Sequence, residues 1–300
     1  MLSTVCNPIL STGRAVPATS TRDEVQVVQQ LATQSSTGSN REFDGTIVSV
    51  EPIMGDALLV SVTAPSSVVQ RLLPGQFFNI ICRFPTSLDP LLRRPYSVFR
   101  VDQAAGTLTF LVRPFGRGSA WLADRKPGEV IGLLGPLGNS FTVNERAQRL
   151  VMLAGGVGVA PLVMLADEAT ARGLDVVFVM GAANEEGLLA PVELPLGVEF
   201  LAATDDGSRG HHGLATDVVA GYVTWADQIF ACGPEPMYRT LREVVNPQRV
   251  NRKPPVQVSV ERGMACGLGA CLGCVVETRR GMIASCVQGP VFDLDDLVIL

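Results

Sequence analysis

Four of the seven cysteines in this 300-residue chain lie close together near its C-terminus and could hold a metal centre. Cys266, Cys271 and Cys274 follow one another at the spacing C-x4-C-x2-C, and Cys286 comes after eleven further residues. This spacing is the opening of the plant-type [2Fe–2S] pattern, in which neighbouring thiolates hold one end of a cluster and a later thiolate closes it. The pattern therefore predicts these four residues as cluster ligands.

The glycines between these cysteines favour the same interpretation. They let the loop adopt positive φ values and point bare backbone N–H groups at a negatively charged tetrathiolate cluster. Structural zinc is the main alternative, although it usually takes paired C-x2-C spacings and this run has no second pair. Free thiols are the third possibility. The other cysteines are scattered singly, which is typical of a reducing compartment and predicts a cytoplasmic protein.

A second group of residues that could bind a ligand stands at the start of a predicted strand, as Arg94-Pro95-Tyr96-Ser97. The guanidinium of Arg94 suits a pyrophosphate, and Tyr96 and Ser97 offer an aromatic face and a hydroxyl to a flat heterocycle. An ordinary edge strand with a solvated arginine is the simpler interpretation of these residues alone. Further along, a Gly116-Arg-Gly118 turn leads into a helix at Ser119, as phosphate sites do, although many turns look the same.

A third group surrounds a glycine turn that follows a short apolar strand. Gly155, Gly156 and Gly158 form the turn, and Pro161 stands where the last glycine of a G-x-G-x-x-G fingerprint would be. This departure argues against the dehydrogenase subclass but keeps the phosphate turn. The segment Cys232-Gly233-Pro234 ends another predicted strand, so it should face the same crevice at the carboxyl ends of a parallel sheet. A buried, unreactive cysteine is the simpler interpretation of Cys232.

The elements that position these residues fall into two domains and a small module. Six short alternating segments between residues 41 and 145 predict an antiparallel β-barrel. Strands alternating with helices over residues 146–256 predict a doubly wound parallel domain. Residues 257–300 form the cysteine module, and residues 1–40, which lack aromatic residues and a sustained apolar period, predict a disordered tail.

Composition limits the possible partners. The net charge is −5 and the charges of both signs are scattered, so we expect no nucleic-acid or anionic-membrane partner. The longest uncharged run, Leu150–Ala166, is broken by glycine and proline and is too short to cross a bilayer. His211 and His212 lie in a polar loop and are not expected to be ligands.

In combination, the three groups of residues resemble the ferredoxin–NADP reductase superfamily and, within it, the electron-transfer subunits of type B dihydroorotate dehydrogenases. The resemblance covers residues 41 to 300, and the cysteine run with Cys286-Val-Gln-Gly-Pro-Val-Phe292 is its most specific part. It implies an FAD-binding barrel, an NAD-binding domain and a [2Fe–2S] module. It also implies that Leu111, Val112, Arg113, Gly118 and Ser119 contact the flavin, in addition to Arg94, Pro95, Tyr96 and Ser97.

The resemblance implies a function as half of an enzyme. An FMN-containing catalytic partner would oxidise dihydroorotate, and electrons would pass through the cluster and FAD to NAD⁺, in an assembly with two copies of each subunit. We expect no catalytic acid or base in this chain. The segment Gly181–Gly187 offers Glu185 and Glu186 and no cation, which predicts NAD rather than NADP. Two alternatives stay open: a reductase subunit of a bifurcating or sulfide-oxidising flavoprotein, and a redox sensor without turnover.

Overall fold

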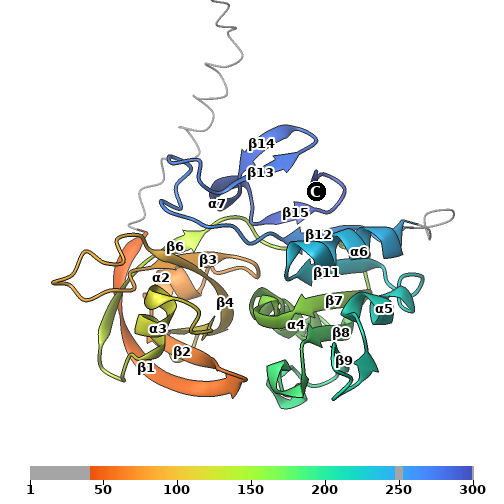
Figure 1. The fold of residues 1–300 in the computed structure, drawn as a ribbon, viewed down its shortest axis with the longest axis horizontal. Coiled ribbons are helices and arrows are strands. Elements are labelled where there is room, and N and C mark those ends of the chain that lie inside the picture. The colour runs from red at the N-terminus through yellow and green to blue at the C-terminus, as the bar shows by residue number, and fades with distance from the viewer. Residues whose placement is uncertain (1–40, 247–252, 299–300) are drawn as a thin grey trace, which may run out of the picture. The chain divides into compact units, whose positions relative to one another are not determined.

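A computed structural model describes residues 41–246 and 253–298, and the predicted disordered tail of residues 1–40 lies outside the described residues. The described chain forms a β-barrel, an α/β sheet and a C-terminal segment that contacts both (Figure 1). None of its helices is long and apolar enough to cross a bilayer.

The barrel has six strands in the order β1-β2-β5-β4-β3-β6, with antiparallel neighbours throughout and β6 closing on β1. Alternate side chains point inward, so that the Phe78 ring meets Phe43 and Phe110 edge-on with centroids 6.0 and 5.7 Å apart. The predicted antiparallel barrel is therefore confirmed. Its elements are β1 (Glu42–Met54), β2 (Ala57–Thr63), α2 (Ser66–Val69), β3 (Phe77–Ile80), β4 (Arg94–Asp102), β5 (Thr107–Val112), α3 (Arg117–Ala123) and β6 (Val130–Leu137).

The second domain is built on a seven-stranded sheet in the order β10-β9-β8-β7-β11-β12-β15. Its strands are β7 (Arg149–Gly155), β8 (Asp175–Ala182), β9 (Glu199–Thr204), β10 (His211–His212), β11 (Gln228–Cys232), β12 (Val256–Ser259) and β15 (Val291–Asp293). All neighbours are parallel except β12 and β15. The pair His211-His212 is the exposed edge strand of this sheet, where the sequence predicted a loop.

Helices cover both faces of this sheet because its central strands are apolar on both sides. On β7, Met152 packs with helix α4 (Ala160–Ala171), whereas Val151 and Leu153 pack with α5 (Ala215–Ala220) and α6 (Glu235–Val245). The predicted doubly wound domain is thus confirmed. The turn before α4 is a short 3-10 helix, η1 (Gly156–Val159), and two further 3-10 turns follow β8, η2 (Glu185–Gly187) and η3 (Pro191–Glu193).

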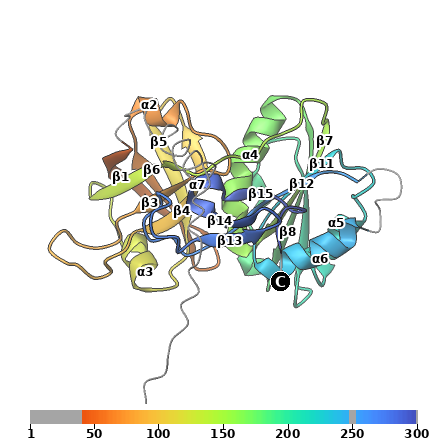
Figure 2. The same ribbon diagram turned by 90° about the horizontal axis from the view of Figure 1, so that it is seen from above.

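The C-terminal segment contains the cysteine loop, a hairpin of β13 (Val275–Thr278) and β14 (Gly281–Ala284), and helix α7 (Ser285–Gln288). It lies over the junction of barrel and sheet in both views (Figure 2). Strand β15 pairs antiparallel with β12, so the C-terminal residues also complete the α/β sheet. The boundary that we predicted between residues 256 and 257 falls inside β12.

Candidate functional site

The Arg-Pro-Tyr-Ser motif opens β4 on the side of the barrel that faces the α/β sheet. The Arg94 guanidinium donates to the carbonyl of Leu92 at 2.7 Å, which fixes the direction of the side chain. A Cβ atom on Gly118 would lie 3.2 Å from Nε of Arg94, so the absence of a side chain at Gly118 makes room for Arg94 at the start of α3. The fold therefore brings two predicted flavin-binding segments into contact.

A cavity of about 600 Å³ lies beside this motif. It brings together three segments that are far apart in the sequence: the barrel motif, the turn before α4 and the start of the cysteine loop. Its walls include Arg94, Pro95, Tyr96, Ser97, Leu111, Arg113, Phe115, Ser119, Val157, Pro161, Glu261, Arg262 and Met264.

Val112 and Ser119, two of the predicted flavin contacts, differ in how they meet this cavity. Val112 points into the barrel core and is completely buried, so that only its backbone could reach a ligand. Ser119 lines the cavity, but its hydroxyl already accepts from the backbone N–H groups of Phe115 and Gly116 at 2.8 and 2.9 Å. Conversely, the sequence analysis missed Phe115, whose ring lines the cavity while 98% exposed.

The glycine turn and the Cys-Gly-Pro segment pack backbone against backbone. They meet because β7 and β11 are neighbours, with Ala154 opposite Cys232. A Cβ on Gly158 would lie 2.3 Å from the carbonyl oxygen of Cys232, and one on Gly155 would lie 2.7 Å from Cδ of Pro234. Glycine is therefore required at both positions for the two loops to approach.

The residues around Cys232 are arranged for packing. Cys232 is 1% exposed, and burial raises the pKa of its thiol well above the ordinary value. Next to it, the Tyr238 hydroxyl accepts from the N–H of Gly233 at 3.0 Å and donates to the carbonyl of Ser259 at 2.6 Å. This loop therefore offers a ligand its backbone at Gly233 and Pro234 rather than the buried thiol.

Each of the four predicted cluster ligands accepts a backbone N–H at its sulfur. The donors are Leu268 to Cys266 at 3.4 Å, Gly273 to Cys271 at 3.5 Å, Cys286 to Cys274 at 3.4 Å and Gly269 to Cys286 at 3.2 Å. Such bonds stabilise thiolate sulfur, and the loop makes them through positive φ at Gly267 and Gly269.

The sulfur of Cys271 lies close enough to Cys266, and that of Cys274 close enough to Cys286, to affect the pKa of the neighbouring thiol. Within residues 41–246 and 253–298, no three His, Cys, Asp or Glu side chains are grouped around one metal-ion position. A [2Fe–2S] cluster takes two thiolates per iron, and the four cysteines of the loop supply this number of donors.

The thiols differ in their readiness to ionise. The N–H of Leu268 is the main reason that the pKa of Cys266 falls to about 6, whereas burial raises the pKa of Cys286 to about 12. A metal centre binds thiolate, so loading releases protons from the cysteines.

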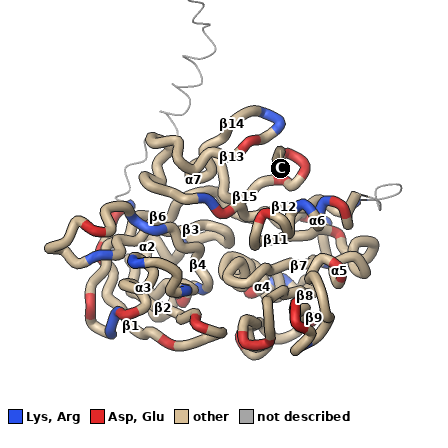
Figure 3. Tube along the Cα trace, in the orientation of Figure 1, with Lys and Arg blue, Asp and Glu red and all other residues tan. Residues whose placement is uncertain are grey.

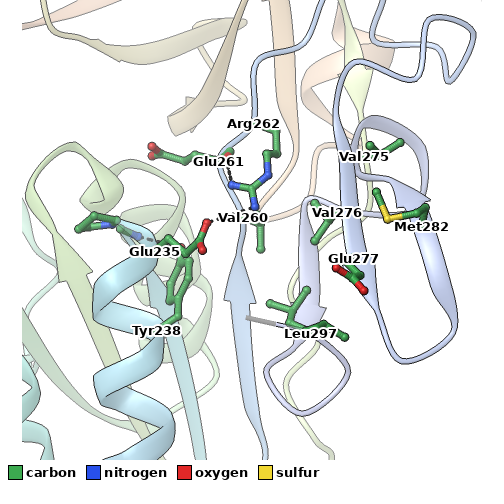
Figure 4. Close-up of a pocket in the computed structure, with 13 residues that line it drawn as sticks. Glu235, Tyr238, Val260, Glu261, Arg262, Val275, Val276, Glu277, Met282 and Leu297 are labelled. Atoms are coloured by element: carbon green, nitrogen blue, oxygen red, sulfur yellow. Dashed lines mark hydrogen bonds and ion pairs between the residues drawn. The ribbon is translucent and has the colours of Figure 1, made fainter. Parts of the chain in front are cut away.

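A second cavity, of about 350 Å³, lies between α6 and the β13–β14 hairpin and borders Gly233 and Pro234 (Figure 4). Arg262 reaches across it to Glu235, with Nη2 and Oε2 3.3 Å apart. Glu261 lines both cavities. Desolvation of its carboxyl group by the surrounding protein raises its pKa. The sequence analysis missed Glu261 and Arg262, although both directly precede the cysteine loop.

The structure adds a cation to the segment that we used to predict NAD. Arg209, from the loop after β9, pairs with Glu185 at 3.2 Å, and the N–H of Glu185 donates to Ser208 Oγ at 2.8 Å. The preference for NAD stays a prediction, because Arg209 places a cation beside Glu185.

Comparison with protein families gives two matches. The oxidoreductase FAD-binding domain matches residues 44–142. The iron-sulfur cluster binding domain of dihydroorotate dehydrogenase B matches residues 261–298, which contain all four cysteines of the loop.

Curated relatives share much of the chain. The dihydroorotate dehydrogenase B (NAD(+)) electron transfer subunit of Bacillus caldolyticus is 39% identical over 231 residues, which are 75% of this chain and 87% of the relative. The subunit of the same name from Desulforamulus reducens is 32% identical over 260 residues, which are 84% of this chain and 97% of the relative.

Solved structures show the same fold. The structure of an NADH-dependent reduced ferredoxin-NADP oxidoreductase, described for flavin-based electron bifurcation, has a TM-score of 0.73 and 26% identity, and 85% of this chain and 90% of that chain are covered. A ferredoxin NADP+ reductase from Neisseria gonorrhoeae, with bound FAD and NADP, has a TM-score of 0.58 at 20% identity. The match covers 73% of this chain and 98% of that chain. The second likeness concerns the fold alone.

Proposed function

Because the chain belongs to the family of type B dihydroorotate dehydrogenase electron-transfer subunits, we propose that it passes electrons from a dihydroorotate-oxidising partner to NAD⁺ in pyrimidine biosynthesis. The chain is an oxidoreductase subunit, and the substrate chemistry belongs to the partner.

The cavity of about 600 Å³ is the observation that supports this proposal most directly. Its walls contain the flavin motif, the turn of the nucleotide domain and the first residues of the cysteine loop. A carrier that links a nicotinamide to a cluster needs both within reach. When bound, FAD exchanges a hydride with nicotinamide and single electrons with a [2Fe–2S] centre.

The chain's own residues would bind and orient these groups. Arg94 offers its guanidinium to a pyrophosphate, and Tyr96 and Ser97 offer their side chains to the isoalloxazine. The backbone of the Gly155–Pro161 turn would receive the phosphates of NAD, with Gly233 and Pro234 beside it. The four cysteines of the loop would hold the cluster, with a backbone N–H at each sulfur.

The surface of the cysteine loop is suited to a protein partner. Residues 263–276 contain no charged side chain (Figure 3), and Leu268 and Leu272 are 58% and 60% exposed. Apolar side chains at a contact exclude water without the cost of burying charge. We infer that this surface meets an FMN-containing catalytic subunit, in a cytoplasmic assembly with two copies of each.

The bifurcating class is the second candidate, because the reduced ferredoxin-NADP oxidoreductase structure is similar to 85% of this chain. The higher identity of the dihydroorotate dehydrogenase relatives, at up to 39%, favours the first candidate. A sensor without turnover would not need the close packing of Gly155 and Gly158 against the Cys232–Pro234 segment.

The test is to purify the chain alone and together with an FMN-containing dihydroorotate dehydrogenase. We expect FAD, about two iron and two sulfide per chain, rapid bleaching of the flavin by NADH, and dihydroorotate-dependent reduction of NAD⁺ by the complex. Zinc without sulfide would contradict the cluster assignment. Ferredoxin reduction without any response to dihydroorotate would favour the bifurcating class.

A further inference from the structure

Asn79 is a polar residue on an otherwise apolar face of the barrel. Strand β3 alternates, so that Phe78 and Ile80 point into the barrel core while Phe77 and Asn79 point outward. Phe77 packs with Leu137 of β6 against Cys274 and Cys286, and Met264 belongs to the same cluster of buried residues. The outer face of β3 therefore forms the floor under the cysteine loop.

The side chain of Asn79 reaches the cysteine loop at Gly267. A Cβ atom on Gly267 would lie 2.5 Å from Nδ2 of Asn79 and 2.9 Å from a methyl group of Leu137. Gly267 follows the first cluster ligand, Cys266, and its φ is +72°. The amide group of Asn79 thus lies directly beneath the cluster-binding turn.

This amide is completely buried and its hydrogen-bonding groups are unsatisfied by the described residues. Asn79 is 0% exposed, and neither Nδ2 nor Oδ1 has a hydrogen-bond partner among residues 41–246 and 253–298. Ser285, next to the predicted ligand Cys286, is likewise 0% exposed, and its hydroxyl has no partner in the described part of the chain. Burying an amide without a partner is costly, so this residue calls for an explanation, such as a group that the protein binds.

We propose that the side-chain amide of Asn79 donates a hydrogen bond to a sulfur atom of the cluster and so raises the reduction potential of the cluster. This inference rests on the proposed cluster assignment. Donors that point at cluster sulfur stabilise the reduced, more negative form, because they offset added charge. Asn79 belongs to the barrel, so the bond would also couple the flavin domain to the cluster.

The test compares the full-length protein, loaded with its cofactors, with the variant Asn79→Leu, which keeps the volume and removes the donor. EPR-monitored redox titration should show a more negative cluster potential. We expect a threefold to tenfold change in the reduction equilibrium, which is about 30–60 mV for one electron. The potential of the flavin should not change, and the cluster should be lost to a chelator roughly tenfold faster.

Leu137→Met is the matched control, because Leu137 touches Gly267 from the same floor and donates no hydrogen bond. It should keep the wild-type cluster potential. If Asn79→Leu also keeps it, or if both variants shift it equally, the proposed bond does not exist. An equal shift of the flavin potential in Asn79→Leu would likewise overturn it.

A second variant covers the case in which Asn79→Leu assembles no cluster. Asn79→Asp keeps the size of the side chain and replaces the donor with an acceptor, so its potential should also be more negative. If both variants bind FAD and fold but lack the cluster while Leu137→Met retains it, the contact is supported. If both lose FAD and folding together, Asn79 is a structural residue and the inference fails. Wild-type protein without iron and sulfide would instead overturn the cluster assignment itself.

Discussion

Arg93 and Arg94 are neighbours in the sequence, but only Arg94 lines the cavity that we propose for FAD. Its guanidinium lines the large cavity, whereas that of Arg93 pairs with Glu42 on β1. We predict that Arg94→Ala weakens FAD binding by about 1.5–3 kcal/mol, because it removes a charge-assisted contact to pyrophosphate. Arg93→Ala is the control and should retain flavin. Equilibrium dialysis of FAD distinguishes the two, and equal losses would show that the motif is in the wrong register.

Asp227 gives a prediction about pH. The guanidinium of Arg149 is the main hydrogen-bond donor that lowers the pKa of this carboxyl group to about 2, and the backbone N–H groups of Gln148 and Arg149, both at 3.1 Å, add to the effect. Since the folded pKa lies below the unfolded value of about 3.9, the carboxylate stabilises the protein above pH ~4 and this contribution is lost as pH falls toward 2. Asp227→Asn should therefore cost about 2 kcal/mol at neutral pH. Urea unfolding from pH 3 to 7 measures this difference, which should shrink on acidification; a difference independent of pH would contradict the assignment.

At the scale of elements, the junction of the turn before α4 with the end of β11 depends on Gly158. Any Cβ at this position would meet the carbonyl of Cys232 at 2.3 Å, so Gly158→Ala must push two backbones apart. We predict a loss of stability of roughly 1–3 kcal/mol and slower flavin reduction by NADH. Gly221→Ala is the control, because its Cβ would lie at an ordinary contact distance of 3.5 Å from the carbonyl oxygen of Val218 and its φ of −69° suits alanine. Urea unfolding and stopped-flow absorbance measure the two effects, and similar behaviour of both variants would refute the close approach.

At the scale of the whole molecule, the cysteine module cannot be removed cleanly. Truncation after Val258 would delete β15 from the sheet and remove Phe292 and Leu294 from the core beneath α6. The point variant Cys286→Ser leaves those contacts in place. We predict that it still binds FAD, reduces dyes with NADH and binds the catalytic partner, but loses dihydroorotate-dependent NAD⁺ reduction. Normal turnover by such a cluster-free complex would show that the cluster is outside the electron path.

The sequence alone determined the features that arise from local patterns. The spacing of Cys266 to Cys286 predicted the cysteine module, apolar alternation predicted the barrel strands, and the Gly155–Pro161 turn between a strand and a helix predicted the α/β domain. These signals are readable because each depends on neighbours within about a dozen residues, through backbone geometry and side-chain periodicity. Both predicted folds were confirmed by the strand order.

Tertiary structure decided which distant residues share a site. In the sequence, Asn79 is a polar residue in an ordinary strand. It lies under Gly267 because the outer face of β3 packs against a loop nearly two hundred residues later in the chain. Glu261 and Phe115 enter the large cavity for the same reason, and Arg209 reaches Glu185 only through the fold. Such contacts leave no local pattern, because they arise when long-range burial of apolar faces brings separate elements together.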